Sequence, residues 1–281
     1  MRQIEADLIK KAVKNLCLEA NFYLRKDVLE ALKKASQSEE SLLGKDILQI
    51  IIKNAELAAE KKLPLCQDTG STSVFLEIGQ EVNIVGQSLE EAVNEGVRQG
   101  YKQGFLRNSM VNDPLFRREN TADNTPALIY SEVVPGNNLR IRVMPKGAGC
   151  DNVSRLKMLK PGDGVAGVKK FILETVKNAN GRACPPLVVG VGIGGSFEMA
   201  PLLAKKSLFR KLGEPHPDQK VSRLEKELLK EINRLGIGPM GIGGTVTALG
   251  VAIEITASHI ASLPVAADIS CHSLRSAETK L

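Results

Sequence analysis

The sequence predicts a mixed α/β fold of the α+β kind, with a helical lead-in over residues 1–62 and interspersed strands and helices over residues 63–281. Three observations predict this class. Apolar residues repeat at helical spacing through the lead-in, short β-branched runs alternate with amphipathic segments after it, and glycine-rich loops separate those segments. A chain of 281 residues can bury a full core, so we expect one continuous domain over 1–281.

The lead-in is expected to contain three amphipathic helices, at residues 2–22, 26–36 and 40–62, because each segment places its apolar residues on one helical face. The segment Leu63-Pro64-Leu65 then breaks the pattern, since proline does not continue a helix. This break places Cys66 on a loop.

The next elements are a short apolar strand at 73–79 and a helix that ends near residue 105. Ser88 and Glu91 form a capping box that opens this helix. Residues 126–134 and 139–145 then alternate between apolar and polar side chains. The Gly-Asn-Asn turn between them predicts that the two strands form a hairpin.

The second half alternates in the same way. A helix is expected at 164–178, a buried strand at 188–195 and a further helix from about Glu198. A charged helix follows at 219–235. Residues 245–257 form an apolar, β-branched run whose periodicity does not decide between helix and strand.

Composition and charge favour a protein of the cytoplasm that binds a small anion. The net charge is +6, and lysine and arginine are spread along helices instead of gathered in one block, which disfavours a nucleic-acid ligand and suits an anionic substrate. The first residues have no apolar signal core, and no run is long enough to span a membrane. The five cysteines have no regular short spacing, which fits a reducing cytosol better than a disulfide framework.

Two glycine-rich motifs in the second half approach nucleotide-binding patterns. Residues 236–241 match G-x-G-x-x-G, but a charged helix precedes them where a nucleotide fold needs a strand. Residues 238–245 approach a phosphate loop, with Gly244 in the position of the essential lysine. Nucleotide binding is therefore disfavoured. The glycines either let main-chain N–H groups approach a ligand or cluster, or form tight turns in a small-residue core.

Cys66, Cys184 and Cys271 each lie beside glycine, proline or polar residues, far apart in the sequence. Three thiolates brought together can hold three irons of a cubane cluster and leave the fourth open as a Lewis acid. Zinc is disfavoured because no C-x-x-C pair exists. A nucleophilic role for Cys66 has no histidine nearby in the sequence, and each cysteine taken alone also fits a small buried residue, as we expect for Cys17.

Five segments resemble the α subunit of the class I, iron–sulfur fumarate hydratase and L-tartrate dehydratase family. They are LPLCQDTGS at 63–71, MPKGAGCDN at 144–152, CPPLVVGVGIGGSFE at 184–198, GPMGIGGTVTALGV at 238–251 and HIASLPVAADISCH at 259–272. Single-chain members of the family carry a second domain after this one. The resemblance therefore implies a separate β subunit, in a hetero-oligomer of two α and two β subunits.

The resemblance also implies a [4Fe-4S] cluster bound by Cys66, Cys184 and Cys271, within a cluster-binding catalytic region over residues 63–281. Cys150 is a competing thiol beside a glycine loop, but its position does not match the family's cluster ligands. The matching positions assign substrate binding to Gln67, Arg107 and Gly149, and catalysis to Asp68 and His259.

The implied reaction is the reversible dehydration of a 2-hydroxydicarboxylate, malate to fumarate or tartrate to oxaloacetate. The family's general base is a threonine on the second domain, so the resemblance places it on the β subunit. The alternative function is a non-catalytic iron–sulfur protein that carries electrons or senses redox state. Three cysteines disfavour this alternative, because electron carriers usually fill every iron site with a protein ligand.

Overall fold

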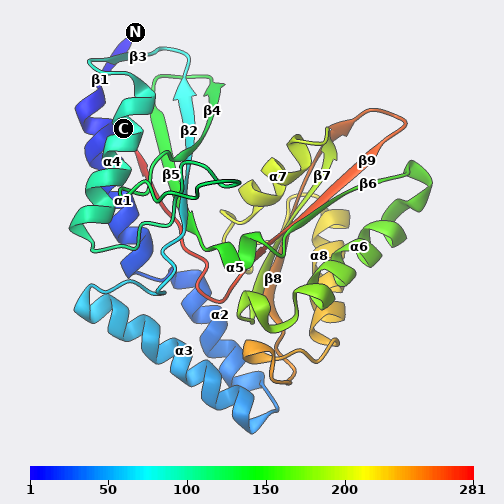
Figure 1. Cartoon of the computed structure of the whole chain (residues 1–281). Helices are drawn as coiled ribbons and strands as arrows, with labels where there is room; N and C mark the ends of the chain where they lie inside the picture. Colours follow the sequence, from blue (N-terminus) through cyan, green and yellow to red (C-terminus); the bar gives the residue numbers. More distant parts are fainter. The chain divides into compact units, whose positions relative to one another are not determined.

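The computed structural model describes all 281 residues, and their contacts divide the chain into two compact units (Figure 1). Unit 1 comprises residues 1–25, 54–148 and 275–281, and unit 2 comprises residues 26–53 and 149–274. Strands and helices are interspersed in both units, which confirms the predicted mixed α/β class. No helix combines the length and the apolar character that crossing a bilayer requires.

Unit 1 is built on a four-stranded sheet in the order β10-β5-β2-β4. Two helices pack against it, and their apolar residues share one core with the sheet (Figure 1). Ile9 and Val13 from the first helix and Val97 from the second are all fully buried there. The elements of unit 1 are α1 (Ala6–Phe22), α4 (Leu89–Gln103), β1 (Arg2–Glu5), β2 (Ser71–Gly79), β3 (Val82–Val85), β4 (Leu128–Val134), β5 (Leu139–Lys146) and β10 (Ala277–Lys280).

The predicted hairpin between the strands at 126–134 and 139–145 is wrong. Strand β2 lies between β4 and β5, parallel to the first and antiparallel to the second. The connection from β4 to β5 crosses the end of β2 at Gly79, where a Cβ atom would lie 2.4 Å from the carbonyl oxygen of Gly136. Alternation and a turn identified both strands. These local signals could not identify the strand that lies between them, because β2 ends 49 residues before β4 begins.

The lead-in helices form largely where periodicity predicts them. α2 (Lys26–Ser38) and α3 (Leu42–Lys61) match the expected segments, and α3 crosses the division between the units. Residues 2–5 differ, because they form strand β1, which pairs in parallel with β3. The capping box at α4 is present: Ser88 Oγ accepts from the Glu91 amide at 3.2 Å, and Glu91 Oε2 accepts from the Ser88 amide at 3.1 Å.

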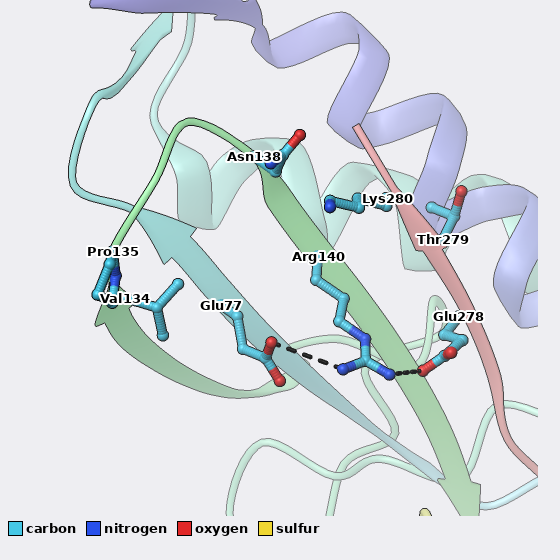
Figure 2. A pocket seen from close by; sticks show the side chains of 8 residues that line it. All are labelled: Glu77, Val134, Pro135, Asn138, Arg140, Glu278, Thr279 and Lys280. Carbon is cyan, nitrogen blue, oxygen red and sulfur yellow. Dashed lines mark hydrogen bonds and ion pairs between the residues drawn. The ribbon is translucent and has the colours of Figure 1, made fainter.

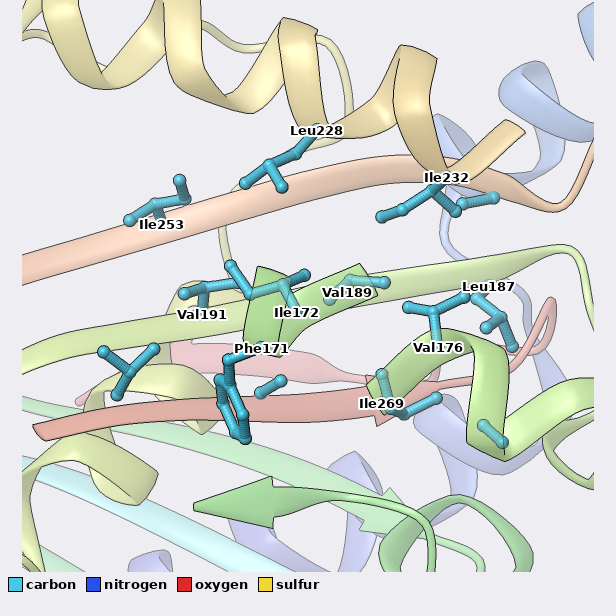
Figure 3. Packing of buried hydrophobic residues seen from close by; sticks show 14 of the residues in the cluster. Phe171, Ile172, Val176, Leu187, Val189, Val191, Leu228, Ile232, Ile253 and Ile269 are labelled. Carbon is cyan, nitrogen blue, oxygen red and sulfur yellow. The ribbon is translucent and has the colours of Figure 1, made fainter. Parts of the chain in front are cut away.

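Unit 2 is a sheet in the order β6-β9-β7-β8 with helices on both faces (Figure 1). α6 and α8 cover one face, where aliphatic side chains form the main core (Figure 3). α7 covers the other face. Besides α2, its elements are α6 (Gly164–Ala179), α7 (Met199–Ser207), α8 (Gln219–Asn233), β6 (Arg155–Leu159), β7 (Leu187–Gly195), β8 (Ala248–Ser258) and β9 (Leu263–Ser270).

Strand β7 shows why this sequence packs tightly on both faces. Val189 and Val191 point into the core beneath α6 and α8 (Figure 3). Gly190 and Gly192 alternate with them and face α7, where a Cβ atom on Gly192 would lie only 2.0 Å from the carbonyl oxygen of Ala200. The glycines therefore allow a close approach of helix to strand. The undecided run at 245–257 is the strand β8 beside β7.

Candidate functional site

In unit 1, the residues that follow Cys66 form a loop that is locked against the end of β5. The Asp68 carboxylate accepts the amide of Gly70 at 3.0 Å and the amide of Ala148 at 2.9 Å. Gly70 has a φ of +74°, and a Cβ atom there would lie 2.3 Å from Lys146 main-chain atoms. The sequence therefore has glycine at a position where two backbones approach closely.

A buried tyrosine and a buried asparagine brace the same loop from behind. Tyr101 Oη lies 2.9 Å from the carbonyl oxygen of Thr69 and 3.0 Å from that of Gly70, and Thr72 Oγ1 donates to it at 3.0 Å. Burial raises the pKa of Tyr101, so the phenol keeps its proton and remains a donor. Asn124 Nδ2 also donates to the Gly70 carbonyl at 3.1 Å.

Four of the predicted site residues belong to this braced region. Cys66 is half-buried, and its Sγ lies 3.6 Å from Oε1 of the exposed Gln67. Thr69 Oγ1 donates to the main-chain oxygen of Arg107 at 2.9 Å. The side chain of Arg107 is exposed, so its guanidinium is available to an anion. Unit 1 thus brings together Cys66, Gln67, Asp68 and Arg107.

Unit 2 brings Cys184 and Cys271 to one end of its sheet. Cys184 comes just before β7 and Cys271 just after β9, and these antiparallel strands pair up to Val188 opposite Ser270. His272 Nδ1 lies 2.9 Å from the carbonyl oxygen of Cys184. Because a carbonyl only accepts, Nδ1 carries the proton and donates. Both thiols are half-buried, and Cys271 Sγ lies 3.1 Å from Ser273 Oγ.

The other two cysteines lie in apolar cores. Cys17 is fully buried in unit 1, and burial raises the pKa of its thiol to about 12. Cys150 is 7% exposed and packs in the main core of unit 2. A thiol in such surroundings resists the deprotonation that metal binding requires.

His259 lies at the opposite end of the sheet from the two cysteines of unit 2. It is exposed in the turn between β8 and β9, where its Nδ1 accepts from the Ala261 amide at 3.1 Å. The eight residues of β9 separate this turn from Cys271. At roughly 3.3 Å per residue, the strand spans about 26 Å. One chain therefore does not bring His259 and Cys271 into a single pocket.

Gly149, the predicted main-chain donor, is exposed at the start of unit 2. A Cβ atom there would meet only the carbonyl oxygen of Arg182, at an ordinary 3.5 Å. Space alone therefore does not require glycine at this position. A role for its N–H group toward a ligand stays a prediction.

The loop that approaches a phosphate-binding pattern does bind an anion, and the anion is a side chain of the same unit. The buried Glu39 carboxylate accepts the amides of Ser41 at 2.9 Å, Thr245 at 2.8 Å and Val246 at 2.8 Å. Burial alone would raise the pKa of Glu39, but these hydrogen bonds outweigh it and lower the pKa. The same loop packs against the cysteine segment, since the Met240 amide donates to the carbonyl of Pro185 at 2.8 Å.

A cavity of about 650 Å³ in unit 1 contains none of the predicted site residues. Figure 2 shows Arg140 between two acids on its wall, with ion pairs of 3.7 Å to Glu77 and 2.7 Å to Glu278. Its charged groups largely neutralise one another. This cavity gives no reason to revise the predicted site.

The residues present fit a thiolate-bound cluster in the chemistry of their donors. All five cysteines are free, and the three predicted ligands are half-buried on loops while the other two are buried. Within neither unit do three His, Cys, Asp or Glu side chains form a metal site of their own. Of the three predicted ligands, Cys66 belongs to unit 1, and Cys184 and Cys271 belong to unit 2.

Several contributors to this region had not been predicted, among them Tyr101, Asn124, His272, Arg275 and Glu39. His272 carried a signal, because it adjoins Cys271 in a matched segment. The others carried none, since each acts on main-chain atoms far away in the sequence.

Comparison with known proteins agrees with the motifs. The family described as fumarate hydratase (Fumerase) matches residues 10–280. A protein of Methanocaldococcus jannaschii with the provisional name L(+)-tartrate dehydratase subunit alpha is 47% identical over 268 residues, which cover 94% of each chain. The L(+)-tartrate dehydratase subunit alpha of an Escherichia coli strain is 33% identical over 272 residues, covering 96% of this chain and 89% of its own. With matches of this extent and its cysteines in the matched segments, the chain belongs to the class I fumarate hydratase and L(+)-tartrate dehydratase α-subunit family.

Proposed function

We propose that this chain is the α subunit of a hydro-lyase that reversibly dehydrates a 2-hydroxydicarboxylate, with a [4Fe-4S] cluster on Cys66, Cys184 and Cys271. The family membership supports the reaction class. One observation carries the ligand assignment: of five free cysteines, only these three are half-buried on loops.

When bound, a cluster with three protein ligands supplies one open iron as a Lewis acid for carboxylate and hydroxyl oxygens. The chain's own residues bind and orient the substrate. Arg107 has the planar guanidinium that binds a carboxylate through two parallel hydrogen bonds. Gln67 offers both a donor and an acceptor beside Cys66. Each Asp68 oxygen already accepts one amide and keeps a second lone pair for the substrate hydroxyl.

We further propose that a β subunit completes the enzyme and supplies the base that removes the C3 proton. The relatives' names support a partner, because they call those proteins α subunits. A complex of two α and two β subunits, located in the cytoplasm, is the arrangement we expect. Tartrate is the substrate in the relatives' names, and fumarate is the substrate in the family's name.

The test is anaerobic reconstitution of the α chain with iron and sulfide, with and without its β partner. Malate and both tartrate enantiomers are then assayed for dehydration. We expect a cluster on the α chain, and turnover of one substrate only when both chains are present. Loss of a general base typically costs about 10²–10⁴-fold in rate. Full turnover by the α chain alone would place the base within these residues and contradict the proposal that the β subunit supplies it.

A further inference from the structure

Unit 1 buries an arginine behind the loop that carries Cys66. Arg275 is 3% exposed. Its Nη1 donates to Oδ1 of Asn21 at 3.0 Å, and its Nη2 donates to the main-chain oxygen of Asp68 at 3.0 Å. Its Nε is buried without a hydrogen-bond partner. A full positive charge is thus buried against neutral oxygen atoms, an arrangement that costs free energy and that a neutral side chain would avoid.

The contacts of Arg275 and Asn21 secure both ends of the segment around Cys66. At its start, the Leu65 amide donates to the main-chain oxygen of Asn21 at 2.8 Å. Asn54 Nδ2 donates to the Leu65 carbonyl at 3.0 Å. At its end, Arg275 holds the Asp68 carbonyl. Cys66 therefore lies between two anchored residues on a segment without regular secondary structure.

The guanidinium is suited to this task, because its planar fork reaches two acceptors at once in fixed directions. Lysine would bring the charge without the fork. Arg275 also follows Cys271 by only four residues in the sequence. The segment that carries one predicted ligand therefore continues directly into the anchor for another.

We propose that Arg275 is a positioning residue for the segment 65–68, holding Cys66, Gln67 and Asp68 in the arrangement that ligand binding uses. The purpose of this positioning rests on the proposed function. The positioning itself is a property of the chain without cofactor, so it can be tested separately.

The experiment measures the alkylation rate of each cysteine in the metal-free full-length chain, under anaerobic conditions, with iodoacetamide and peptide mass spectrometry. Arg275→Met removes the fork and the charge. Hydrogen bonds to charged groups are strong enough that we expect Cys66 to react about tenfold faster. The rates of Cys184 and Cys271 in unit 2 should stay unchanged. Arg275→Lys should lie between wild type and Arg275→Met.

Arg142→Met is the matched control. Arg142 is a half-buried arginine of unit 1 that lies on β5 and is paired with Glu77 on β2. It should lower stability without changing the rate at Cys66. Equal Cys66 rates in Arg275→Met and Arg142→Met would overturn the proposal. If Arg275→Met does not fold, Arg275→Lys decides by the same criterion, with a wild-type rate at Cys66 counting against positioning.

A second readout separates this inference from the proposed function. Iron retention in the reconstituted chain during a chelator challenge should fall in Arg275→Met and remain at the wild-type level in Arg142→Met. If wild type holds no cluster while Cys66 is still alkylated faster in Arg275→Met, the cofactor assignment fails and the positioning stands. If wild type holds a cluster and Arg275→Met changes neither readout, the positioning alone fails.

Discussion

The loop of unit 1 that carries Cys66 and the sheet end of unit 2 that carries Cys184 and Cys271 present the same chemical group by different means. Side chains hold the first: Tyr101, Asn124 and Arg275 donate to or contact its main-chain oxygens. Backbone pairing between β7 and β9 holds the second, and His272 adds a side-chain contact to the carbonyl oxygen of Cys184. The thiol of unit 1 is therefore vulnerable to individual side-chain changes, and the thiols of unit 2 are vulnerable to changes in the sheet.

The largest expected effect comes from removing any one of the three predicted cluster ligands, and it should be the same in both regions. Cys66→Ala, Cys184→Ala and Cys271→Ala should each abolish cluster retention after anaerobic reconstitution, because each removes one of three ligands. Iron and sulfide analysis of the purified chain measures this. Cys17→Ala and Cys150→Ala are the controls and should retain both. A full complement of iron in any of the first three variants would contradict the ligand assignment.

Glu39→Gln tests the loop of unit 2 that Glu39 holds at Thr245 and that packs against the Cys184 segment through the hydrogen bond from Met240 to Pro185. The amide cannot accept from all the N–H groups that the carboxylate satisfies, so we expect a loss of about 2–3 kcal/mol in the free energy of unfolding at neutral pH. Urea denaturation followed by circular dichroism measures it.

The pH dependence of that loss follows from the lowered pKa of Glu39. The carboxylate is less readily protonated in the folded state than at its ordinary value of 4.5. Its contribution is therefore fully present above pH 4.5 and is lost as the pH falls through the folded-state value. The difference in the free energy of unfolding between wild type and Glu39→Gln should therefore become smaller below pH 4.5. A difference that becomes larger below pH 4.5 would contradict a lowered pKa of Glu39 in the folded state.

Gly192→Ala tests whether backbone packing holds the sheet end. The new methyl group would lie 2.0 Å from the carbonyl oxygen of Ala200, so we expect a loss of about 1–3 kcal/mol in unfolding free energy. Gly162→Ala is the control, because a Cβ atom there meets nothing within 4 Å. In the metal-free chain, Gly192→Ala should also speed alkylation of Cys184 more than that of Cys66. The reverse order would break the distinction between the two regions.

The smallest expected effect concerns His259. His259→Ala should leave iron content and unfolding free energy within error of wild type, because β9 separates it from Cys271 by about 26 Å. If activity nevertheless falls, a second copy must supply this histidine. Mixing His259→Ala with Cys271→Ala chains would then restore part of the activity. A cluster lost in His259→Ala would show that the separation along β9 does not isolate the two residues.

The sequence by itself determined the elements whose signals are local. The periodicity of residues 26–36 and 40–62, the capping box at Ser88 and the β-branched run at 188–195 each predicted the element that forms. The motifs around the cysteines also sufficed to identify the family. Such signals lie within a few residues of one another, so a single segment carries them complete.

Only the tertiary structure decided the features that join distant segments. It inserted β2 between two strands expected to pair, and it filled a phosphate-like loop with Glu39 from more than two hundred residues earlier. It placed His259 and Cys271 at opposite ends of β9, although they lie twelve residues apart in one motif. It also set Arg275 behind the loop of Cys66. Three of these share one physical reason: a hydrogen-bond donor or a sheet edge is satisfied by whichever partner the packed core brings within reach, and sequence distance does not limit that choice. The separation of His259 from Cys271 has another cause, because an extended strand carries its two ends far apart.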